Sequence, residues 1–305
     1  MANPHEATVM LSILIPIFNE DSRDLVHALI KQCSDAGIAF EILCFDDGSD
    51  EMTRSTNREL MTTNNVRYEE MPENLGRAAI RNQMVRASTY NHLLLIDGDS
   101  AMEDDRYITR YLPWIGQFKV VYGGRTYQRA LPDDPSLHLH WIYGSQREAL
   151  PANQRKGYAR FMTNNVLIPK KALFEHPLNE TLKGYGHEDT LLGQSLEAAG
   201  IPIIHIDNPL RHAGLENRDH FLQKTRTGIH NLLKIRKLGA DDREITLLMT
   251  YRRLKTWKMA GVARFILRRL KPTIQQRLST NQPNLFWFDM FKLQYLLDIV
   301  GKQKV

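Results

Sequence analysis

The chain has 305 residues, of which 42% are hydrophobic and 25% are charged, and its formal net charge is +5 at pH 7. This is the composition of an ordinary globular protein, and no stretch is of low complexity. A net charge this small does not by itself indicate binding to nucleic acid. The length allows one α/β domain with an appended region.

The two cysteines, Cys33 and Cys44, are too few for a disulfide framework or a zinc site. We predict that both are buried, reduced thiols in a cytosolic protein. The N-terminus lacks a charged segment followed by an apolar stretch and a cleavage site. No apolar run approaches the roughly 20 residues that span a bilayer. We therefore expect a cytoplasmic protein with at most a peripheral contact at the inner face of the plasma membrane.

The first hundred residues alternate between strand and helix patterns. Helical spacing predicts helices at residues 21–36, from about residue 50, and at residues 76–88. Apolar runs predict strands at residues 9–18, 40–45, 66–71 and 92–96. Such alternation is typical of right-handed βαβ units, so we expect a mostly parallel sheet covered by helices.

The pattern after residue 100 is less regular. We expect a helix at 103–114, a strand at 119–122, a loop at 131–140 that leads into another helix, a strand at 164–169, a helix at 188–199 and a strand at 201–206. From about residue 216 to 277 the chain is predicted to be helical and basic. The predicted domains are an α/β domain at 1–215, in two halves that meet at about residue 100, and a helical C-terminal extension at 216–305.

Polar residues follow each of the first four predicted strands. In open α/β sheets, ligands bind beyond the carboxyl ends of the strands, so these residues are expected to share one edge. The four groups are Asn19-Glu20, Asp46-Asp47, Glu73-Asn74 and Asp97-Gly98-Asp99. The convergence of acidic and amide groups predicts a functional site at that edge.

The Asp97-Gly98-Asp99 segment places two carboxylates on one tight turn. Hard oxygen ligands of this kind suit a divalent cation, and a cation neutralises a departing diphosphate. The alternative is an ordinary surface turn, because Asp-Gly is common turn chemistry. Asp46-Asp47 could likewise be a turn and helix cap, or the acidic group of a dinucleotide-binding fold. The dinucleotide interpretation fails because residues 16–20 lack the glycines of a pyrophosphate-binding turn.

Together these motifs resemble the inverting family-2 glycosyltransferases of the GT-A fold, which are Rossmann-like with a mostly parallel sheet. The resemblance runs from about residue 9 to 212 and rests on four motifs in order, each weak alone. They are Ser12 to Glu20, Asp46-Asp47-Gly48-Ser49, Glu73-Asn74-Leu75-Gly76 with Arg77 and Arg81-Asn82, and the Asp97-Gly98-Asp99 turn.

The resemblance implies that residues 1–215 form a catalytic domain, with a nucleotide-sugar half at about 1–100 and an acceptor half at about 101–215. It also implies a role for each motif on the donor side. Asp46 or Asp47 would contact the base, usually uracil, while Asp97 would face the ribose or the metal and Asp99 would bind Mn²⁺ or Mg²⁺. The remaining residues expected to bind the nucleotide sugar are Pro16, Phe18, Asn19, Glu20, Asn74, Arg77, Arg81, Gly98 and Asn164. Arg77 and Arg81 lie one helical turn apart, which suits a diphosphate, although a solvated helix face is the plain alternative for both.

The segment Gly184 to Asp189 resembles the acceptor-side motif of many family members. Transfer requires a base for the acceptor hydroxyl, and we assign that role to Asp189, with Glu188 as a hydrogen-bonding partner; the two roles could be exchanged. A helix start that favours acids is the structural alternative. The motif favours galactose or an N-acetylhexosamine as the sugar, by resemblance only.

The resemblance implies that His212 completes the metal site with Asp99, and neutral imidazole is a reasonable ligand for manganese or magnesium. The alternative is an exposed loop histidine without a ligand role. His205 is the second choice, although it lies within a predicted strand. His138 and His140 are spaced like a metal pair but have no acids nearby, so we expect a structural role for them. Trp141 and Tyr185 could stack on a sugar, but aromatic residues are more often core.

The sequence thus predicts an inverting transferase that moves a sugar from a nucleotide diphosphate, most simply UDP, to a glycan or lipid-linked glycan in a bacterial polysaccharide pathway. Two alternatives stay open. One is a nucleotidyltransferase acting on sugar phosphates, which would want a glycine-rich phosphate loop that is missing here. The other is a non-catalytic sugar-binding protein of the same fold, although clustered carboxylates are costly to keep without use.

Residues 251–271 carry eight basic residues, no acid, and interleaved apolar residues that include Trp257 and Phe265. A basic amphipathic helix of this kind is typical of contact with a membrane surface. The alternative is that the apolar stripe packs on the catalytic domain or on a second subunit, as in a homodimer, while the cations face water. Residues 284–295 are predicted to form a final helix docked on this one.

Overall fold

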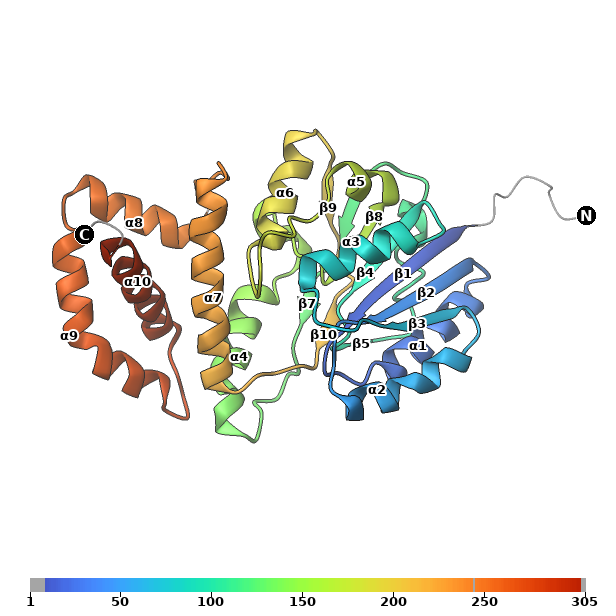
Figure 1. Cartoon of the computed structure of the whole chain (residues 1–305), viewed down its shortest axis with the longest axis horizontal. Helices are drawn as coiled ribbons and strands as arrows, with labels where there is room; N and C mark the ends of the chain where they lie inside the picture. Colours follow the sequence, from blue (N-terminus) through green and yellow to red (C-terminus); the bar gives the residue numbers. More distant parts are fainter. Residues whose placement is uncertain (1–8, 244, 303–305) are drawn as a thin grey trace, which may run out of the picture. The chain divides into compact units, whose positions relative to one another are not determined.

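The computed structural model describes residues 9–243 and 245–302, and its contacts divide the chain into two compact units (Figure 1). The first unit contains the chain as far as Tyr127, together with Ala149–Thr181 and Glu188–Gly214. The second contains Gln128–Glu148, Leu182–His187 and the chain from Leu215 onward. The assignment of nucleotide-sugar and acceptor halves within the catalytic domain stays a prediction.

The first unit is built on a seven-stranded sheet in the order β3-β2-β1-β4-β8-β6-β9. The strands β1, β2, β3 and β4 run parallel, β8 is antiparallel to both of its neighbours, and β9 is parallel to β6. Their bounds are β1 (Met10–Ile17), β2 (Ala39–Asp46), β3 (Val66–Glu70), β4 (His92–Ile96), β6 (Val120–Tyr122), β8 (Asn165–Pro169) and β9 (Ile203–His205). The mostly parallel sheet and the positions of its strands confirm the sequence prediction.

Both faces of this sheet are buried, which explains the apolar runs of its strands. In β1, Ile13 and Ile15 pack with the helix on one face, and Leu14 packs with the helices on the other. The first face is covered by α1 (Arg23–Asp35); the second is covered by α3 (Arg77–Ala87), α5 (Lys170–Glu175) and α6 (Glu188–Ala198). The helix α2 (Glu51–Asn57) and the 3-10 turn η1 (Arg58–Thr62) connect β2 to β3.

A small second sheet, which the sequence did not reveal, holds three short strands in the order β5-β10-β7. Their bounds are β5 (Ser100–Ala101), β7 (Arg125–Thr126) and β10 (Leu210–His212). The antiparallel register of β10 and β5 sets His212 opposite Ser100. Residues more than a hundred positions apart in sequence are therefore brought beside the end of β4.

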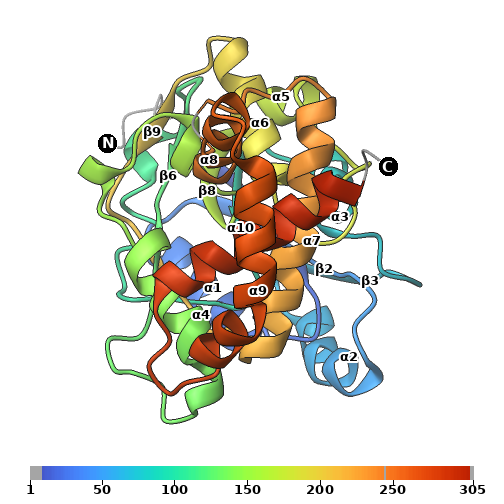
Figure 2. The same ribbon diagram turned by 90° about the vertical axis from the view of Figure 1, so that its left-hand side faces the viewer.

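The second unit is helical, with bounds α4 (His138–Tyr143), α7 (Arg218–Lys237), α8 (Thr246–Thr256), α9 (Ala260–Leu278) and α10 (Leu285–Lys302). Aromatic rings join α4, α7 and α10, because Phe221 stacks on Phe288 with ring centroids 5.4 Å apart and Tyr143 meets both rings. The helix α10 packs along α9, as expected for the final helix (Figure 2). No helix in the described part of the chain is both long enough and apolar enough to cross a bilayer.

Short helical turns complete the described elements. Beyond η1 they are η2 (Leu112–Trp114), η3 (Pro135–Leu137), the π-helical η4 (Gly144–Glu148), η5 (Ala152–Gln154) and η6 (Tyr158–Arg160). Cys33 and Cys44 are buried and unpaired, as predicted, and burial raises the pKa of Cys33 to about 12. A thiol with such a raised pKa stays protonated and unreactive at neutral pH.

The helix predicted at residues 103–114 is wrong. Only η2 is helical there, and the rest of the segment forms turns. The side chain of Gln32 takes the place of helical backbone partners: it donates to the Asp104 carbonyl and accepts the Ile108 N–H at 2.9 and 3.0 Å. The Asp104 carboxylate also accepts the Arg106 N–H at 2.8 Å. Hydrogen bonds from side chains therefore override the helical spacing.

Candidate active site

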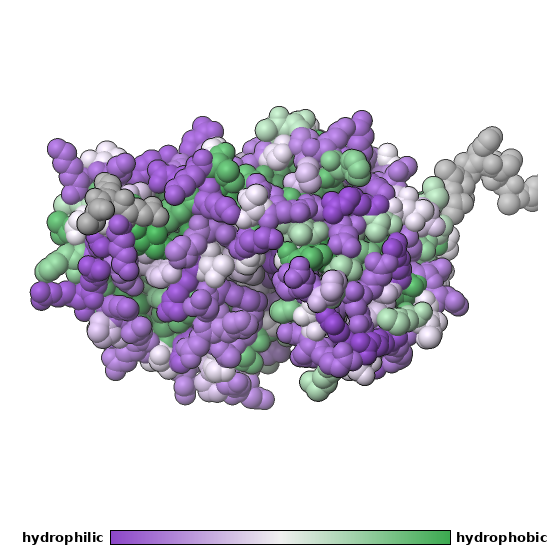
Figure 3. All heavy atoms as spheres, in the orientation of Figure 1, coloured by the Kyte–Doolittle hydropathy of each residue, from purple (hydrophilic) through white to green (hydrophobic). Residues whose placement is uncertain are grey.

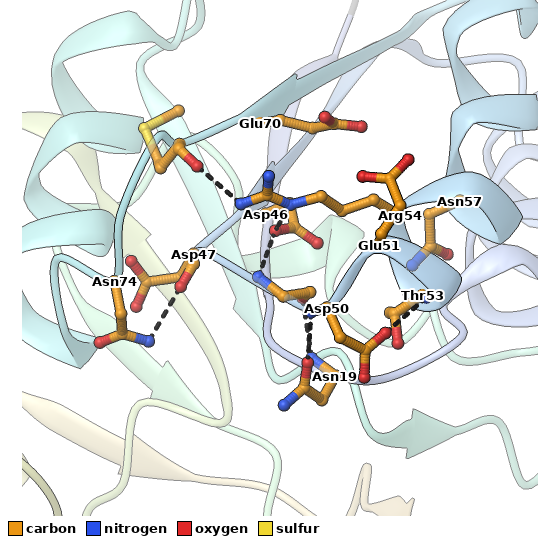
Figure 4. Close-up of polar contacts among 12 residues, drawn as sticks. Asn19, Asp46, Asp47, Asp50, Glu51, Thr53, Arg54, Asn57, Glu70 and Asn74 are labelled. Carbon is orange, nitrogen blue, oxygen red and sulfur yellow. Dashed lines mark hydrogen bonds and ion pairs between the residues drawn. The ribbon is translucent and has the colours of Figure 1, made fainter.

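The loop after β2 is fixed by Asp47 (Figure 4). Its two carboxylate oxygens accept the backbone N–H groups of Leu75 and Gly76 at 2.7 and 3.1 Å, and its carbonyl accepts the Asn74 amide at 2.8 Å. Burial raises the pKa of Asp47, although these N–H groups oppose that effect. Asp47 thus holds the start of α3 against the end of β2.

Asp46 is fully buried beneath this loop. One carboxylate oxygen accepts the Ser49 N–H at 2.8 Å and lies 3.4 Å from Nε of Arg54. The other oxygen has no hydrogen-bond partner among the described residues. These are the two acids predicted to contact a base. Asp46 has a carboxylate oxygen without a hydrogen-bond partner but is the more deeply buried of the two. Both carboxylate oxygens of Asp47 already accept backbone N–H groups.

The loop after β1 is tied to the same region. Asn19 has a left-handed backbone with φ of 54°; its N–H donates to the Ser49 hydroxyl and its side-chain oxygen accepts the Asp50 N–H (Figure 4). The Glu20 carbonyl accepts the amide of Asn57 at 2.8 Å. Pro16 lies near the end of β1, and Phe18 is 51% exposed. The loops after β1 and β2 thus form one connected rim, as the sequence predicted for their polar residues.

Gly48 has no room for a side chain. Its φ is +81°, and a Cβ there would lie 2.7 Å from the backbone nitrogen of Asn74. Gly37 also has a positive φ, +63°, but nothing lies within 4 Å of its Cβ position. We expect Gly48→Ala to lower the free energy of unfolding by about 2–4 kcal/mol and Gly37→Ala by only about 1 kcal/mol. Urea unfolding of both variants checks this, and equal losses would contradict the close approach of the two loops.

Asp97, at the end of β4, is surrounded by guanidinium groups. Its Oδ1 accepts from Arg81, and its Oδ2 lies 3.1 Å from Arg125 and 3.6 Å from Arg77. Burial raises the pKa of Asp97, but the charges of Arg77 and Arg81 outweigh burial and lower it. Arg81 is only 2% exposed, so the solvated-face alternative for this residue is wrong. Asp97 therefore orders a cluster of cations at the sheet edge.

Asp99 pairs with His212, with Oδ2 of the aspartate 3.2 Å from Nδ1 of the histidine. Oδ1 of Asp99 is buried and has no hydrogen-bond partner among the described residues. Burial raises the pKa of Asp99, but the charge and hydrogen bond of His212 overcome this and bring it well below its usual value. Gly98 lets the turn pass close to β1, because a Cβ at Gly98 would lie 3.0 Å from the carbonyl oxygen of Pro16.

An ionised carboxylate beside an imidazole is a ligand pair suited to Mn²⁺ or Mg²⁺. The buried, unpartnered Oδ1 of Asp99 fits such a role, because an orphaned acceptor is costly without a ligand. No group of three or more His, Cys, Asp or Glu side chains with metal-binding geometry exists within the described ranges. A metal ion held by Asp99 and His212 would therefore take its other ligands from water or from substrate oxygens.

Gly214 leaves space for the Asp99 carboxylate. A Cβ at Gly214 would lie 2.6 Å from Oδ2 of Asp99, whereas nothing lies within 4 Å of a Cβ at Gly261. We expect Gly214→Ala to displace Asp99 and to weaken Mn²⁺-dependent nucleotide binding about tenfold or more. Calorimetric titration of the variant checks this, with Gly261→Ala as the control that should bind normally. Unchanged nucleotide affinity in Gly214→Ala would contradict the role of Asp99 and His212 as metal ligands.

Asp189 and Glu188 open α6, and each has a specific partner. Oδ1 of Asp189 accepts the hydroxyl of the fully buried Thr163 at 2.6 Å. Burial and the neighbouring Glu188 charge raise the pKa of Asp189 to about 6, against the opposing effects of Arg77 and Thr163. A carboxylate with a pKa near 6 is ionised at neutral pH yet remains a usable base.

Arg77 connects the two halves of the predicted site. Its Nε donates to Glu188 at 2.7 Å, and its terminal nitrogen lies 3.6 Å from Asp97. Asn164 lies beside them in the fold: its carbonyl accepts the Asp97 N–H, and its side-chain oxygen is buried without a hydrogen-bond partner in the described part of the chain. Residues from β4, α3, α6 and the start of β8 therefore meet at one place.

The other histidines considered have structural roles. His205 lies in β9 and bonds to the carbonyl of Gly157 at 2.9 Å. His138 bonds to two backbone carbonyls, and His140 stacks on Phe221 and accepts the Glu216 N–H. His212 is itself in strand β10 rather than in a loop.

The sequence missed several residues of this site. Arg125 reaches Asp97 from β7, Thr163 reaches Asp189, and the ring of Tyr127 meets that of His212 edge to face with centroids 5.4 Å apart. None of them belongs to a motif with a fixed spacing, so no local signal could have identified them. Only the small β5-β10-β7 sheet brings Arg125 and Tyr127 here.

Comparisons with known proteins point to one class. Among solved structures, the chain is similar to a mannosyltransferase from Pyrobaculum calidifontis, PcManGT, solved with GDP-Man and Mn²⁺, at 12% identity and a TM-score of 0.59 over 98% of this chain and 87% of that chain. It is also similar to residues 1–349 of S. aureus TarS in complex with UDP, at 15% identity and a TM-score of 0.52 over 97% of this chain and 92% of that chain. At these identities the likeness concerns the fold.

The fold is that of the GT-A glycosyltransferases, with a helical C-terminal region. More particularly, residues 12–182, more than half of the chain, match Glycosyl transferase family 2. The chain belongs to that family.

Proposed function

We propose that the protein is an inverting glycosyltransferase that moves a sugar from a nucleotide diphosphate to a hydroxyl group of a glycan or lipid-linked glycan. The observation that carries the proposal is the position of Arg77 between Asp97 and Glu188. The guanidinium of Arg77 thus links the arginines around Asp97, on the proposed donor side, to Glu188 and Asp189 at the start of α6. A diphosphate and an attacking hydroxyl need these two kinds of groups side by side.

The donor side would be held by the loops after β1, β2 and β4. Asp46 or Asp47 would contact the base, with the backbone of the rim around Asn19 and Asn74 enclosing it. Arg77, together with Arg81 and Arg125 on Asp97, would balance the negative charge of the diphosphate. The unpartnered side-chain oxygen of Asn164 would accept a sugar hydroxyl.

A divalent metal would be held by Asp99 and His212, with oxygen ligands from the diphosphate. When bound, it would neutralise charge on the leaving nucleoside diphosphate. The solved complex of PcManGT with GDP-Man and Mn²⁺ supports this choice of cofactor.

The acceptor hydroxyl would lose its proton to Asp189. Because Oδ1 accepts the Thr163 hydroxyl, we assign the proton to Oδ2. The hydroxyl oxygen forms a bond to the anomeric carbon as the bond to the diphosphate oxygen breaks, and the diphosphate leaves with the electron pair. Attack from the face opposite the leaving group inverts the anomeric configuration. Glu188, held by Arg77, would bind the acceptor beside it.

The donor is UDP-linked in our proposal. TarS, solved with UDP, supports this, and the GDP-Man complex of PcManGT makes a GDP-sugar the alternative. A hexose or an N-acetylhexosamine is the proposed sugar. We place the protein in the cytoplasm, in contact with the inner face of the membrane.

Release of nucleoside diphosphate from a panel of UDP- and GDP-sugars, with Mn²⁺ and a mixture of glycan acceptors, tests the proposal. Release with at least one UDP-sugar is expected. Release of pyrophosphate from a sugar phosphate and a nucleoside triphosphate would instead indicate a nucleotidyltransferase. Binding of nucleotide sugar with no release under any condition would indicate a non-catalytic binding protein of this fold.

A further inference from the structure

The helix α9 has two apolar faces. The buried face, formed by Leu267, Ile274 and Leu278, lies on the side that packs along α10. The exposed face lies on a different side of the helix. Its members are separated by three, four and eight positions, which places them on one side of a helix; they are Val262, Phe265, Ile266 and Leu270, between 38% and 59% exposed.

Two more exposed apolar residues lie in the turn before α9. Trp257 is 69% exposed and Met259 is 44% exposed. We call the six residues, Trp257, Met259, Val262, Phe265, Ile266 and Leu270, the outer face of α9. Figure 2 shows α9 in front of α10, with the side away from α10 turned toward the viewer. In Figure 3, hydrophobic surface is visible among hydrophilic atoms over α8 to α10. A clustered exposed apolar face of this kind marks an interaction surface.

The segment that carries the outer face has charges of one sign. Between Ile245 and Phe288 there is no Asp or Glu, and there are nine basic residues: Arg252, Arg253, Lys255, Lys258, Arg264, Arg268, Arg269, Lys271 and Arg277. Arg264 and Arg268 pair with Asp298 of α10, and Arg252 pairs with Asp242. Arg269 lies over the ring of Phe265, 4.8 Å from its centroid. Lys255, Lys258, Lys271 and Arg277 make no ion pair within the described residues.

We propose that the outer face of α9 docks on an anionic lipid surface. Its aromatic and aliphatic side chains would enter the boundary between headgroups and acyl chains, and the surrounding cations would contact lipid phosphates. Charge complementarity favours this occupant over a second copy of the chain, because two such faces would bring like charges together. The inference concerns a surface in the second unit and does not depend on the proposed reaction.

Co-sedimentation of the purified full-length protein with vesicles tests this proposal. We expect binding to vesicles that contain phosphatidylglycerol, weaker binding as salt is raised, and little binding to pure phosphatidylcholine. The double variant Phe265→Ser/Ile266→Ser should lose affinity for the anionic vesicles by about tenfold or more. The matched control is Phe174→Ser in α5, a residue that is 64% exposed in the first unit; it should bind like the parent.

Thermal unfolding should change by only a few degrees in the double variant, because about half of each replaced side chain is exposed. Equal affinity of the parent and the double variant for anionic vesicles would overturn the proposal. A second result would also overturn it: the parent protein does not bind vesicles and is a dimer in analytical ultracentrifugation, whereas the double variant is a monomer. The outer face of α9 would then bind a second copy of the chain.

Discussion

Asp189→Asn is expected to lower kcat by about 1000-fold while the dissociation constant of the donor stays within about twofold. Asparagine keeps an acceptor for the Thr163 hydroxyl but cannot take a proton from the sugar acceptor. Steady-state kinetics and calorimetric donor titration measure the two quantities separately. Asp219→Asn is the control, because Asp219 has an 81% exposed side chain outside the proposed site. Loss of donor binding in Asp189→Asn would show that this residue serves the donor and is not the base.

The pH dependence follows from the raised pKa of Asp189. The base must be ionised, so the activity of the parent should rise as the pH increases through about 6 and then level off. The remaining activity of Asp189→Asn should lack this rise. A flat profile for the parent between pH 5 and pH 8 would contradict the assignment.

The same variant should be more stable than the parent at high pH. A folded-state pKa above the unfolded value means that ionisation of Asp189 opposes folding, and this penalty is fully present above the folded pKa and absent below the unfolded one. Asp189→Asn should therefore raise the free energy of unfolding on the order of 1–3 kcal/mol at pH 8, and the gain should disappear near pH 4. Urea unfolding at the two pH values measures it.

Asp99→Ala is expected to weaken nucleoside diphosphate binding about 100-fold in the presence of Mn²⁺ and to have little effect in its absence. Oδ1 of Asp99, which is buried and has no hydrogen-bond partner among the described residues, is the atom that a metal ion would bind. Titration of UDP into the parent and the variant, with Mn²⁺ and with chelator, measures the difference. Asp105→Ala, at an exposed position of the same unit, should behave like the parent. Equal loss with and without metal would mean that Asp99 contacts the nucleotide directly.

The sheet was predictable because its strands are buried on both faces and therefore read as continuous apolar runs. The edge that holds the site was predictable for a related reason, since parallel strands end on the same side. The partnership of Asp99 and His212 came from the family resemblance. The structure explains how the two residues meet: β10 pairs with β5 in a register that sets His212 opposite Ser100, next to Asp99.

The surroundings of Asp97 were not predictable. Its cation cluster draws Arg125 from a two-residue strand and Arg81 from a helix face that could equally have been solvated. The segment 103–114 shows the same limit, because one distant glutamine replaces its helical hydrogen bonds. In both cases side chains that are distant in sequence determine the local structure. The spacing of residues along the chain does not indicate such contacts.

The most direct test of the proposed chemistry is the anomeric configuration of the sugar released when the parent protein slowly hydrolyses its donor, followed by proton NMR. If water takes the place of the acceptor and Asp189 removes its proton, an α-linked donor should give the β-sugar first, and Asp189→Asn should release almost none. Initial formation of the α-sugar, or unchanged hydrolysis by Asp189→Asn, would contradict an inverting transferase with this base.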